Sequence, residues 1–384
     1  MGMLPAGGVT WDYIQYPLGF TLLGHDVWYI EDTRIWPVFQ PISDGGSNSL
    51  PNVAYLASVM ERFGMSDRWA YRDEVSDSWF GMSAADVGEI CRTADLLVNV
   101  SCANVMRDEY RKIPHRVLID SDPMFTQAQY ELAMAFHGTP GMREAVAGHN
   151  HHFSFGERIG QPDCQVPRSG VTWLATRQPV CLDAWPVLPL PAGRKRFTTV
   201  MNWTAARDFE FQGQTWGQKN VEFAKVMELP GHVPDVSLEV AVAQTGKVAA
   251  PFPSAATISA GWTILDPAKE VPDTESYRAF IQRSSGEFSV AKEAYVKART
   301  GWFSGRSACY LASGRPVVAQ DTGWSEIIPA GNGLFAFNTM EDAVEAVEAI
   351  TASHPAQSQA ARGIAEEYFD SSKVLGSLLA RVSP

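Results

Sequence analysis

Short apolar runs alternate with amphipathic helical stretches along the whole chain. The apolar runs form two series, at residues 27–30, 96–100 and 116–120 and then at 196–201, 238–242, 261–265 and 317–319. Apolar residues at helical spacing stand between them, for example at 13–23, 54–63, 84–92 and 304–312, and again from 342 to 382. Short strands that alternate with helices are typical of a doubly wound parallel sheet. We therefore expect an α/β protein.

The two series meet in a proline-rich stretch. Prolines stand at positions 179, 186, 189 and 191, and the alternation of strand and helix restarts at Arg196. A chain of 384 residues also exceeds what one hydrophobic core normally supports. We expect a first domain at residues 1–188, a second domain at residues 189–356, and a helical tail at residues 357–384.

A glycine pair, Gly7-Gly8, precedes the first helical pattern and is expected to form a loop. A strand should come before such a loop in a parallel sheet, but only residues 1–5 stand there, and Pro5 fits poorly into a strand ladder. We expect either a vestigial first strand or a protein that begins upstream of Met1.

The run from Gly301 to Gly323 carries the clearest chemical signal. Ser304 and Ser307 are residues that cap helices, Gly314 and Pro316 end a helix, and residues 317–319 form a short buried strand. The first N–H groups of a helix have no partner within it and attract anions. With Arg299 and Arg306 on either side, the helix start is expected to hold a diphosphate. The alternative is a helix–strand unit that binds no ligand.

The same run resembles the donor-nucleotide signature of glycosyltransferases that have the two-domain GT-B fold. The similar residues are LASGRPVVAQDTG, 311–323, and the turn GWFS, 301–304. Segments 8–32 and 284–318 also resemble a group of bacterial glycosyltransferase-like proteins. The resemblance implies two Rossmann-like domains that face each other across a cleft, with the last helix crossing back to the first domain. It also implies a nucleoside-diphosphate sugar as donor, held by the second domain, and a small-molecule or glycan acceptor.

The resemblance assigns donor contacts to the second domain. Basic residues would lie on the diphosphate, the turn before the helix would approach it closely, and the loop after the strand would contact the sugar. The donor set is Lys219, Glu287, Lys292, Arg299, Gly301, Ser304, Arg306, Ser307, Asp321, Thr322 and Gly323. For Lys219 the alternative is a solvated lysine at a helix start, and for Glu287 and Lys292 it is a salt bridge within a helix.

One departure from the family pattern concerns the reaction. Retaining enzymes of the largest GT-B family place two glutamates eight residues apart, and the matching positions here hold Gly301 and Cys309. We therefore expect either an inverting transfer or no transfer. An inverting transfer needs a base from the first domain, and the candidates are Asp12, Asp122 and His151. The alternatives are a pseudo-glycosyltransferase, a sugar-nucleotide epimerase, or a sugar-nucleotide-binding protein without turnover.

The composition of the chain limits the binding partners and the cellular compartment that we expect. The net charge of −12, from 31 basic and 43 acidic residues, argues against a broad nucleic-acid footprint. Five cysteines without a Cys-x-x-Cys pair indicate neither a disulfide framework nor a zinc site. The histidines at 149, 151 and 152 could bind a metal. The favoured interpretation is that one of these histidines acts as a general base near the cleft. We expect a cytoplasmic, metal-independent, hexosyltransferase-like enzyme that needs no cofactor and has no membrane segment.

Overall fold

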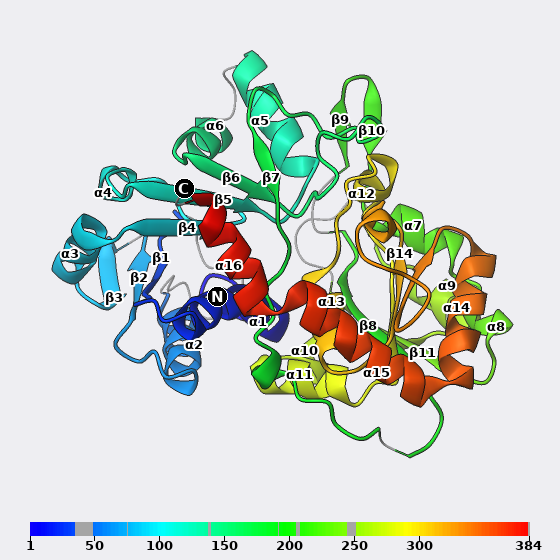
Figure 1. Ribbon diagram of the computed structural model, residues 1–384. Coiled ribbons are helices and arrows are strands. Elements are labelled where there is room, and N and C mark those ends of the chain that lie inside the picture. Colours follow the sequence, from blue (N-terminus) through cyan, green and yellow to red (C-terminus); the bar gives the residue numbers. More distant parts are fainter. Residues whose placement is uncertain are drawn as a thin grey trace.

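The computed structural model describes residues 1–34, 49–74, 76–136, 140–190, 192–204, 208–243 and 251–382. Two α/β domains lie side by side, the first in blue and cyan and the second in green to orange (Figure 1). The first domain is built mainly from residues before the proline-rich stretch, and the second domain is built from residues after it.

The second domain contains a six-stranded, all-parallel sheet of order β12-β11-β8-β13-β14-β15. Its strands are β8 (Arg196–Asn202), β11 (Ser237–Ala243), β12 (Thr263–Leu265), β13 (Gly286–Ser289), β14 (Val317–Gln320) and β15 (Leu334–Phe337). The order reverses between β8 and β13. In an open α/β sheet, ligands bind beyond the carboxyl ends of the strands at that reversal. The carboxyl ends of β8 and β13 are therefore the expected ligand-binding position of this sheet.

Helices cover both faces of this sheet because its strands are apolar on both sides; Val317 and Val318 of β14, for example, are completely buried. The helices of the second domain are α7 (Lys219–Lys225), α8 (Leu229–His232), α9 (Ser254–Ser259), α10 (Pro267–Glu270), α11 (Thr274–Gln282), α12 (Glu293–Lys297), α13 (Gly305–Ala312) and α14 (Met340–Ala352). A hairpin of β9 (Phe209–Phe211) and β10 (Gln214–Trp216) precedes α7. Helix α13 begins one residue after Ser304, as expected.

Within the residues that the structure describes, the first domain contains two sheets. One is parallel throughout and has the order β4-β5-β6-β7, with β4 (Leu96–Val100), β5 (His115–Asp120), β6 (His151–Ser154) and β7 (Trp173–Ala175). The other joins β1 (Tyr29–Glu31) to β2 (Trp69–Asp73) in parallel and β2 to β3 (Ser78–Gly81) antiparallel. The helices are α1 (Gly7–Leu22), α2 (Leu50–Arg62), α3 (Ala84–Thr93), α4 (Asp108–Arg111), α5 (Phe125–Phe136) and α6 (Pro140–Ala147).

The glycine pair does not form the predicted loop, because α1 already begins at Gly7. A Cβ at Gly7 would lie 2.1 Å from the carbonyl oxygen of Asp273, and a Cβ at Gly8 would lie 3.0 Å from the ring of Tyr277. The two glycines therefore allow α1 to pack closely against the start of α11 in the second domain.

The chain ends by crossing back to the first domain, as the resemblance implies. Helix α15 (His354–Ile364) lies along the second domain, a π-helical turn (Ala365–Phe369) follows, and α16 (Ser371–Val382) packs on α1 (Figure 1). Leu375 and Leu378 of α16 share a buried cluster with Tyr16 and Phe20 of α1. Among the helices that the structure describes, none is long and apolar enough to cross a membrane.

Candidate active site

The two domains contact each other at the carboxyl end of β5. The ammonium of Lys292 donates to both carboxylate oxygens of Asp122, at 2.9 and 2.8 Å, and the hydroxyl of Tyr295 donates to the same carboxylate. The indole Nε1 of Trp302 donates to the carbonyl of Ser121 at 3.1 Å. The predicted base Asp122 and the predicted donor residue Lys292 are therefore partners of each other.

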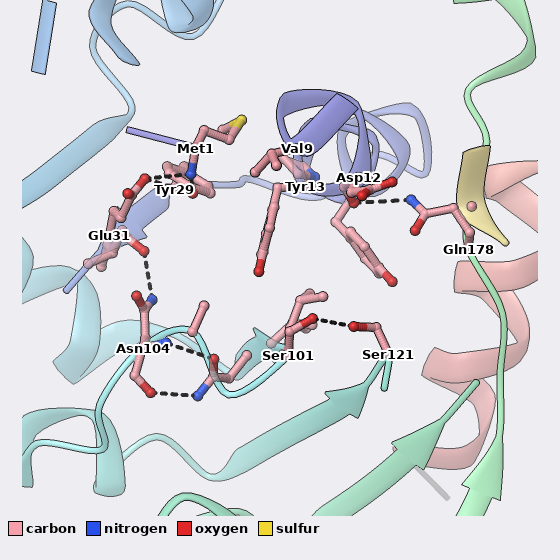
Figure 2. Close-up of a pocket in the computed structure, with 18 of the residues that line it drawn as sticks. Met1, Val9, Asp12, Tyr13, Tyr29, Glu31, Ser101, Asn104, Ser121 and Gln178 are labelled. Carbon is pink, nitrogen blue, oxygen red and sulfur yellow. Dashed lines mark hydrogen bonds and ion pairs between the residues drawn. The ribbon is translucent and has the colours of Figure 1, made fainter. Parts of the chain in front are cut away.

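A cavity of about 1740 Å³ lies between the domains. The second domain lines it with the end of β8, the start of α7 and the start of α13, which are the elements at the strand reversal. The first domain lines it with α1. In Figure 2, Asp12 and Tyr13 of α1 lie on one side of the cavity and Ser101 and Ser121 on the other.

The start of α13 faces this cavity. Ser304 is its N-cap residue, and the Ser304 hydroxyl makes no cap hydrogen bond although the side chain is buried. A Cβ at Gly305 would lie 3.2 Å from the carboxylate Oδ1 of Asp12 and 3.2 Å from Oε1 of Gln178. The first turn of the helix, with its unpaired N–H groups, thus lies directly across from the first domain.

Lys219, the first residue of α7, brings a positive charge to the same place. It lines the cavity, and within the described residues its ammonium has no ion-pair or hydrogen-bond partner. The pKa of Lys219 is lowered to about 7, mainly by burial and also by the charges of Arg306 and Lys292. A phosphate beside Lys219 would relieve both effects, because a negative charge favours the protonated amine.

Arg306 also lines the cavity, but protein groups hold its guanidinium. It donates to the carboxylate of Glu287, to the hydroxyl of Ser289 and to the carbonyl of Val200. Burial acts to lower the pKa of Arg306, but the charge and hydrogen bond of Glu287 together with the nearby tyrosines Tyr277 and Tyr310 raise it, and the net pKa is raised. The predicted donor residues Arg306 and Glu287 therefore form a buried ion pair beneath the start of α13.

Arg299 lies elsewhere. Its guanidinium donates to Asp163 of the first domain at 2.6 Å and also binds Glu326, and Arg299 does not line the cavity. The loop after β14 is similarly engaged: the carboxylate of Asp321 accepts the N–H of Gly323 at 2.8 Å, and Thr322 donates to the carbonyl of Trp302. The structure does not bring these predicted donor contacts together with Lys219.

The side chain of Arg158, from the first domain, covers that loop. A Cβ at Gly301 would lie 2.8 Å from Cγ of Arg158, and a Cβ at Gly323 would lie 2.5 Å from its Cδ. Both glycines have positive φ, 76° and 95°. Near the same helix, Ser307 is completely buried with its hydroxyl unpaired, and Cys309 accepts a long hydrogen bond from Gln15 at 3.7 Å. The positions that hold glutamates in retaining enzymes are thus covered by Arg158 and Gln15.

Of the three predicted bases, Asp12 lies opposite the start of α13 across the cavity and has a raised pKa. Its side chain is exposed to the cleft, yet the surrounding protein raises the pKa of Asp12 to about 7 by desolvation, with Arg306 acting in the opposite direction. Such a carboxyl group is ionised in part at neutral pH and is a stronger base than an ordinary aspartate. Gln178 holds the backbone of Asp12 by donating to its carbonyl at 3.1 Å.

His151 lies away from this group. It is the first residue of β6, at the amino end of the sheet, and its Nε2 lies 3.2 Å from Nδ1 of His115. His149 and His152 bond instead to the carbonyls of Ala145 and Val146. Across the ranges that the structure describes, no three His, Cys, Asp or Glu side chains gather as a metal site would require.

Sequence reasoning missed two cavity residues. Gln178 lies in the first domain after β7 and donates to the backbone carbonyl of Asp12, and Tyr277 of α11 lies against Gly8 of α1; both line the cavity. Neither belongs to a recognisable motif. Only the packing of α1 against the second domain brings them to the site.

Comparison with known proteins supports the architecture. No protein-family model matches the sequence, and no curated protein matches it. Among solved structures, the chain is similar to AviGT4, a glycosyltransferase involved in avilamycin A biosynthesis, with a TM-score of 0.51 and 11% identity over 98% of this chain and 90% of that one. The chain therefore has the two-domain GT-B fold of glycosyltransferases.

Two further solved structures give lower scores. Sucrose-phosphate synthase from Thermosynechococcus elongatus has a TM-score of 0.48 and 10% identity over 96% of this chain and 91% of its own. A glycosyltransferase from Rickettsia africae ESF-5 has a TM-score of 0.46 and 11% identity over 98% of this chain and 94% of its own.

Proposed function

We propose that the protein is a glycosyltransferase that moves a sugar from a nucleoside-diphosphate sugar to an acceptor. The observation that carries the proposal is the convergence of an unpaired lysine, Lys219, and a helix start at Ser304 on the strand reversal of the second domain. Both are suited to a diphosphate, since one supplies a positive charge and the other supplies free N–H groups. The acceptor enters from the first domain, where Asp12 faces the same helix start.

The proposed chemistry separates two tasks between the domains. Lys219 and the N–H groups of α13 stabilise the negative charge that develops on the departing diphosphate. Asp12 takes the proton from the acceptor hydroxyl during a single inverting displacement. Asp122 suits this task less well because Lys292 and Tyr295 already occupy its carboxylate. The reaction takes no metal ion, because Lys219 and the helix start supply the charge that a metal would bring.

One observation favours a second candidate, a sugar-nucleotide-binding protein without turnover. Arg158 of the first domain packs over Gly301 and Gly323, which both belong to the predicted donor contacts. Domain movement would have to free the loop after β14 before transfer if that loop contacts the sugar.

The first test is donor binding. Nucleoside diphosphates and their sugars should raise the melting temperature of the protein, and Lys219→Ala should weaken the binding of the active nucleotide by about 1.5–3 kcal/mol, the range for a hydrogen bond to a charged group. Lys225→Ala is the matched control, because Lys225 lies on the same helix but pairs with Glu222. Release of free nucleoside diphosphate from a bound donor then separates transfer or hydrolysis from binding alone. Equal affinity for both variants would contradict the assignment of Lys219.

A further inference from the structure

The charged side chains that line the interdomain cavity differ in sign between the two domains. The lysine and the arginine among them, Lys219 and Arg306, both belong to the second domain. Within the described ranges, the first domain lines the cavity with no lysine or arginine. Besides two histidines, it contributes the carboxyl groups of Asp12, Asp26, Glu31, Asp95 and Asp122.

The ammonium group of Met1 also lines the cavity, but protein groups hold it. It donates to the carboxylate of Glu31 at 2.8 Å and to the hydroxyl of Tyr29 at 3.0 Å. An anionic acceptor would therefore find no unpaired cation among the described residues of the first domain, and it would meet carboxyl groups that repel it.

Three hydroxyl groups gather on the first-domain side of the same cavity. Tyr13 follows Asp12 on α1 and points its ring toward Ser101 (Figure 2). Ser101 comes directly after β4 and Ser121 directly after β5, and their hydroxyls bond to each other. All three residues line the cavity. A hydroxyl group can donate one hydrogen bond and accept two, so these groups keep capacity for a ligand.

The turn after β4 has an uncommon backbone conformation. Ser101 and Cys102 both have positive φ, 58° and 52°, although neither is glycine. The N–H of Ser101 donates to the carbonyl of Ile119 at 2.7 Å, and the carbonyl of Ser121 accepts the indole N–H of Trp302. Non-glycine residues with such angles persist only where their surroundings hold them, and they gather at functional sites. The two serines are thus fixed in place at the cavity wall.

A fourth hydroxyl comes from the second domain. Tyr277 of α11 lines the cavity, and its ring lies against α1, where a Cβ at Gly8 would approach it to 3.0 Å. Among the described residues, no group forms a hydrogen bond with the Tyr277 hydroxyl, although the charges of Arg306 and Asp12 both act on it. The packing of the ring fixes this side chain, and its hydroxyl remains available to a ligand.

We propose that the acceptor is an uncharged sugar, bound between the hydroxyls of Tyr13, Ser101, Ser121 and Tyr277. This inference rests on the proposed function. One hydroxyl oxygen of the sugar forms the new bond to the anomeric carbon of the donor as the diphosphate leaves, and its proton passes to Asp12. The other sugar hydroxyls bond to the protein hydroxyls. A phenol suits the site less well, because its single hydroxyl would leave most of these polar groups without partners.

Binding experiments test the charge and the hydroxyl groups of the acceptor. The protein is saturated with the nucleoside diphosphate that raises its melting temperature most. The probes are the methyl glycosides of glucose, galactose and mannose, the methyl glycosides of the three matching uronic acids, and 4-methylphenol. In titrations followed by saturation-transfer NMR, at least one neutral glycoside should bind at least about 10-fold more tightly than its uronic acid, because like charges repel across the site.

Two substitutions assign this binding to the hydroxyl groups. Tyr277→Phe and Ser121→Ala should each weaken glycoside binding about 3- to 10-fold, the effect of one neutral hydrogen bond. Tyr277→Phe should leave the melting temperature unchanged, because the ring still packs on α1 and the lost hydroxyl bonds no described group. Tyr130→Phe is the matched control, since Tyr130 lies on α5 and does not line the cavity.

Four results would overturn the proposal. They are a uronic acid that binds as tightly as its neutral glycoside, binding of 4-methylphenol without any neutral glycoside, no binding of any probe, and a Tyr277→Phe variant that melts earlier but binds the glycoside unchanged. The proposed function fails separately, if no nucleoside diphosphate binds. The same titrations without nucleotide would then decide whether the site takes an uncharged sugar.

Discussion

The carboxylate of Asp12 in the first domain lies directly over Gly305, the first residue of α13 in the second domain, so that a Cβ there would approach Oδ1 to 3.2 Å. A base and an anion-binding helix start are thereby placed on opposite sides of one cavity. Because α1 packs against α11 and α13, the position of Asp12 depends on the contact between the domains.

We predict that Asp12→Asn lowers kcat about 10²-fold or more while nucleotide binding persists. In the unsubstituted protein, kcat should rise as the pH rises through about 7, since only the ionised carboxylate takes a proton and desolvation by the walls of the cleft raises the pKa of Asp12 to about 7. Initial rates and calorimetric affinities across this pH range measure both effects. Asp122→Asn is the comparison, and a larger loss of kcat there than in Asp12→Asn would identify Asp122 as the base.

The same carboxyl group predicts a pH dependence of stability. The folded protein holds the Asp12 proton more tightly than the unfolded chain, with a pKa of about 7 against 3.8. Its contribution to stability is therefore fully present below about pH 4 and is lost as the pH rises to about 7. Asp12→Asn should gain stability relative to the unsubstituted protein over that interval, which thermal unfolding at a series of pH values will show. A constant difference would mean that Asp12 is solvated like an ordinary aspartate.

The buried pair of Arg306 and Glu287 predicts an asymmetric response to substitution. Arg306→Ala should destabilise the fold by about 3–5 kcal/mol, because it leaves the carboxylate of Glu287 buried without its cation. The double variant Arg306→Met, Glu287→Leu should lose much less stability, since both buried charges are removed together. Urea unfolding of the two variants tests this, and equal losses would show that packing and not charge determines the effect.

A side chain at position 323 would meet two costs, a steric clash with Arg158 and the backbone strain of a positive φ. Comparison with Gly331 measures the clash separately from the strain. Gly323 and Gly331 both have positive φ, 95° and 101°, but a Cβ at Gly331 meets open space, whereas one at Gly323 meets Arg158. Gly323→Ala should therefore cost about 1–3 kcal/mol more than Gly331→Ala. The difference should shrink when Arg158→Ala is added, as a double-mutant cycle would measure. If the two substitutions lower the stability equally, Arg158 does not pack against Gly323 in solution.

The proposed single displacement predicts the configuration of the product. Proton NMR should show an anomeric configuration opposite to that of the donor, and EDTA should leave the rate unchanged because no metal takes part. Retention of configuration would show that the reaction proceeds without the glutamate pair and without an inverting base.

Local signals in the sequence were enough for the helix start at Ser304 and Gly305, the strand at residues 317–320 and the division into two α/β domains. Capping residues, Gly314, Pro316 and apolar periodicity act over a few residues, so these features do not depend on distant parts of the chain. The sequence also placed Lys219 at a helix start, where the structure finds it facing the cavity.

Tertiary structure decided which charged side chains meet. Arg299 and Asp163 are separated by more than a hundred positions in the sequence, and so are Asp122 and Lys292, yet both are pairs in the folded protein. No local pattern records such pairing, because it arises when two separately formed domains pack together. For the same reason Gly7 and Gly8 read as a loop in the sequence, whereas the approach of α11 shows that they make room for a neighbouring helix.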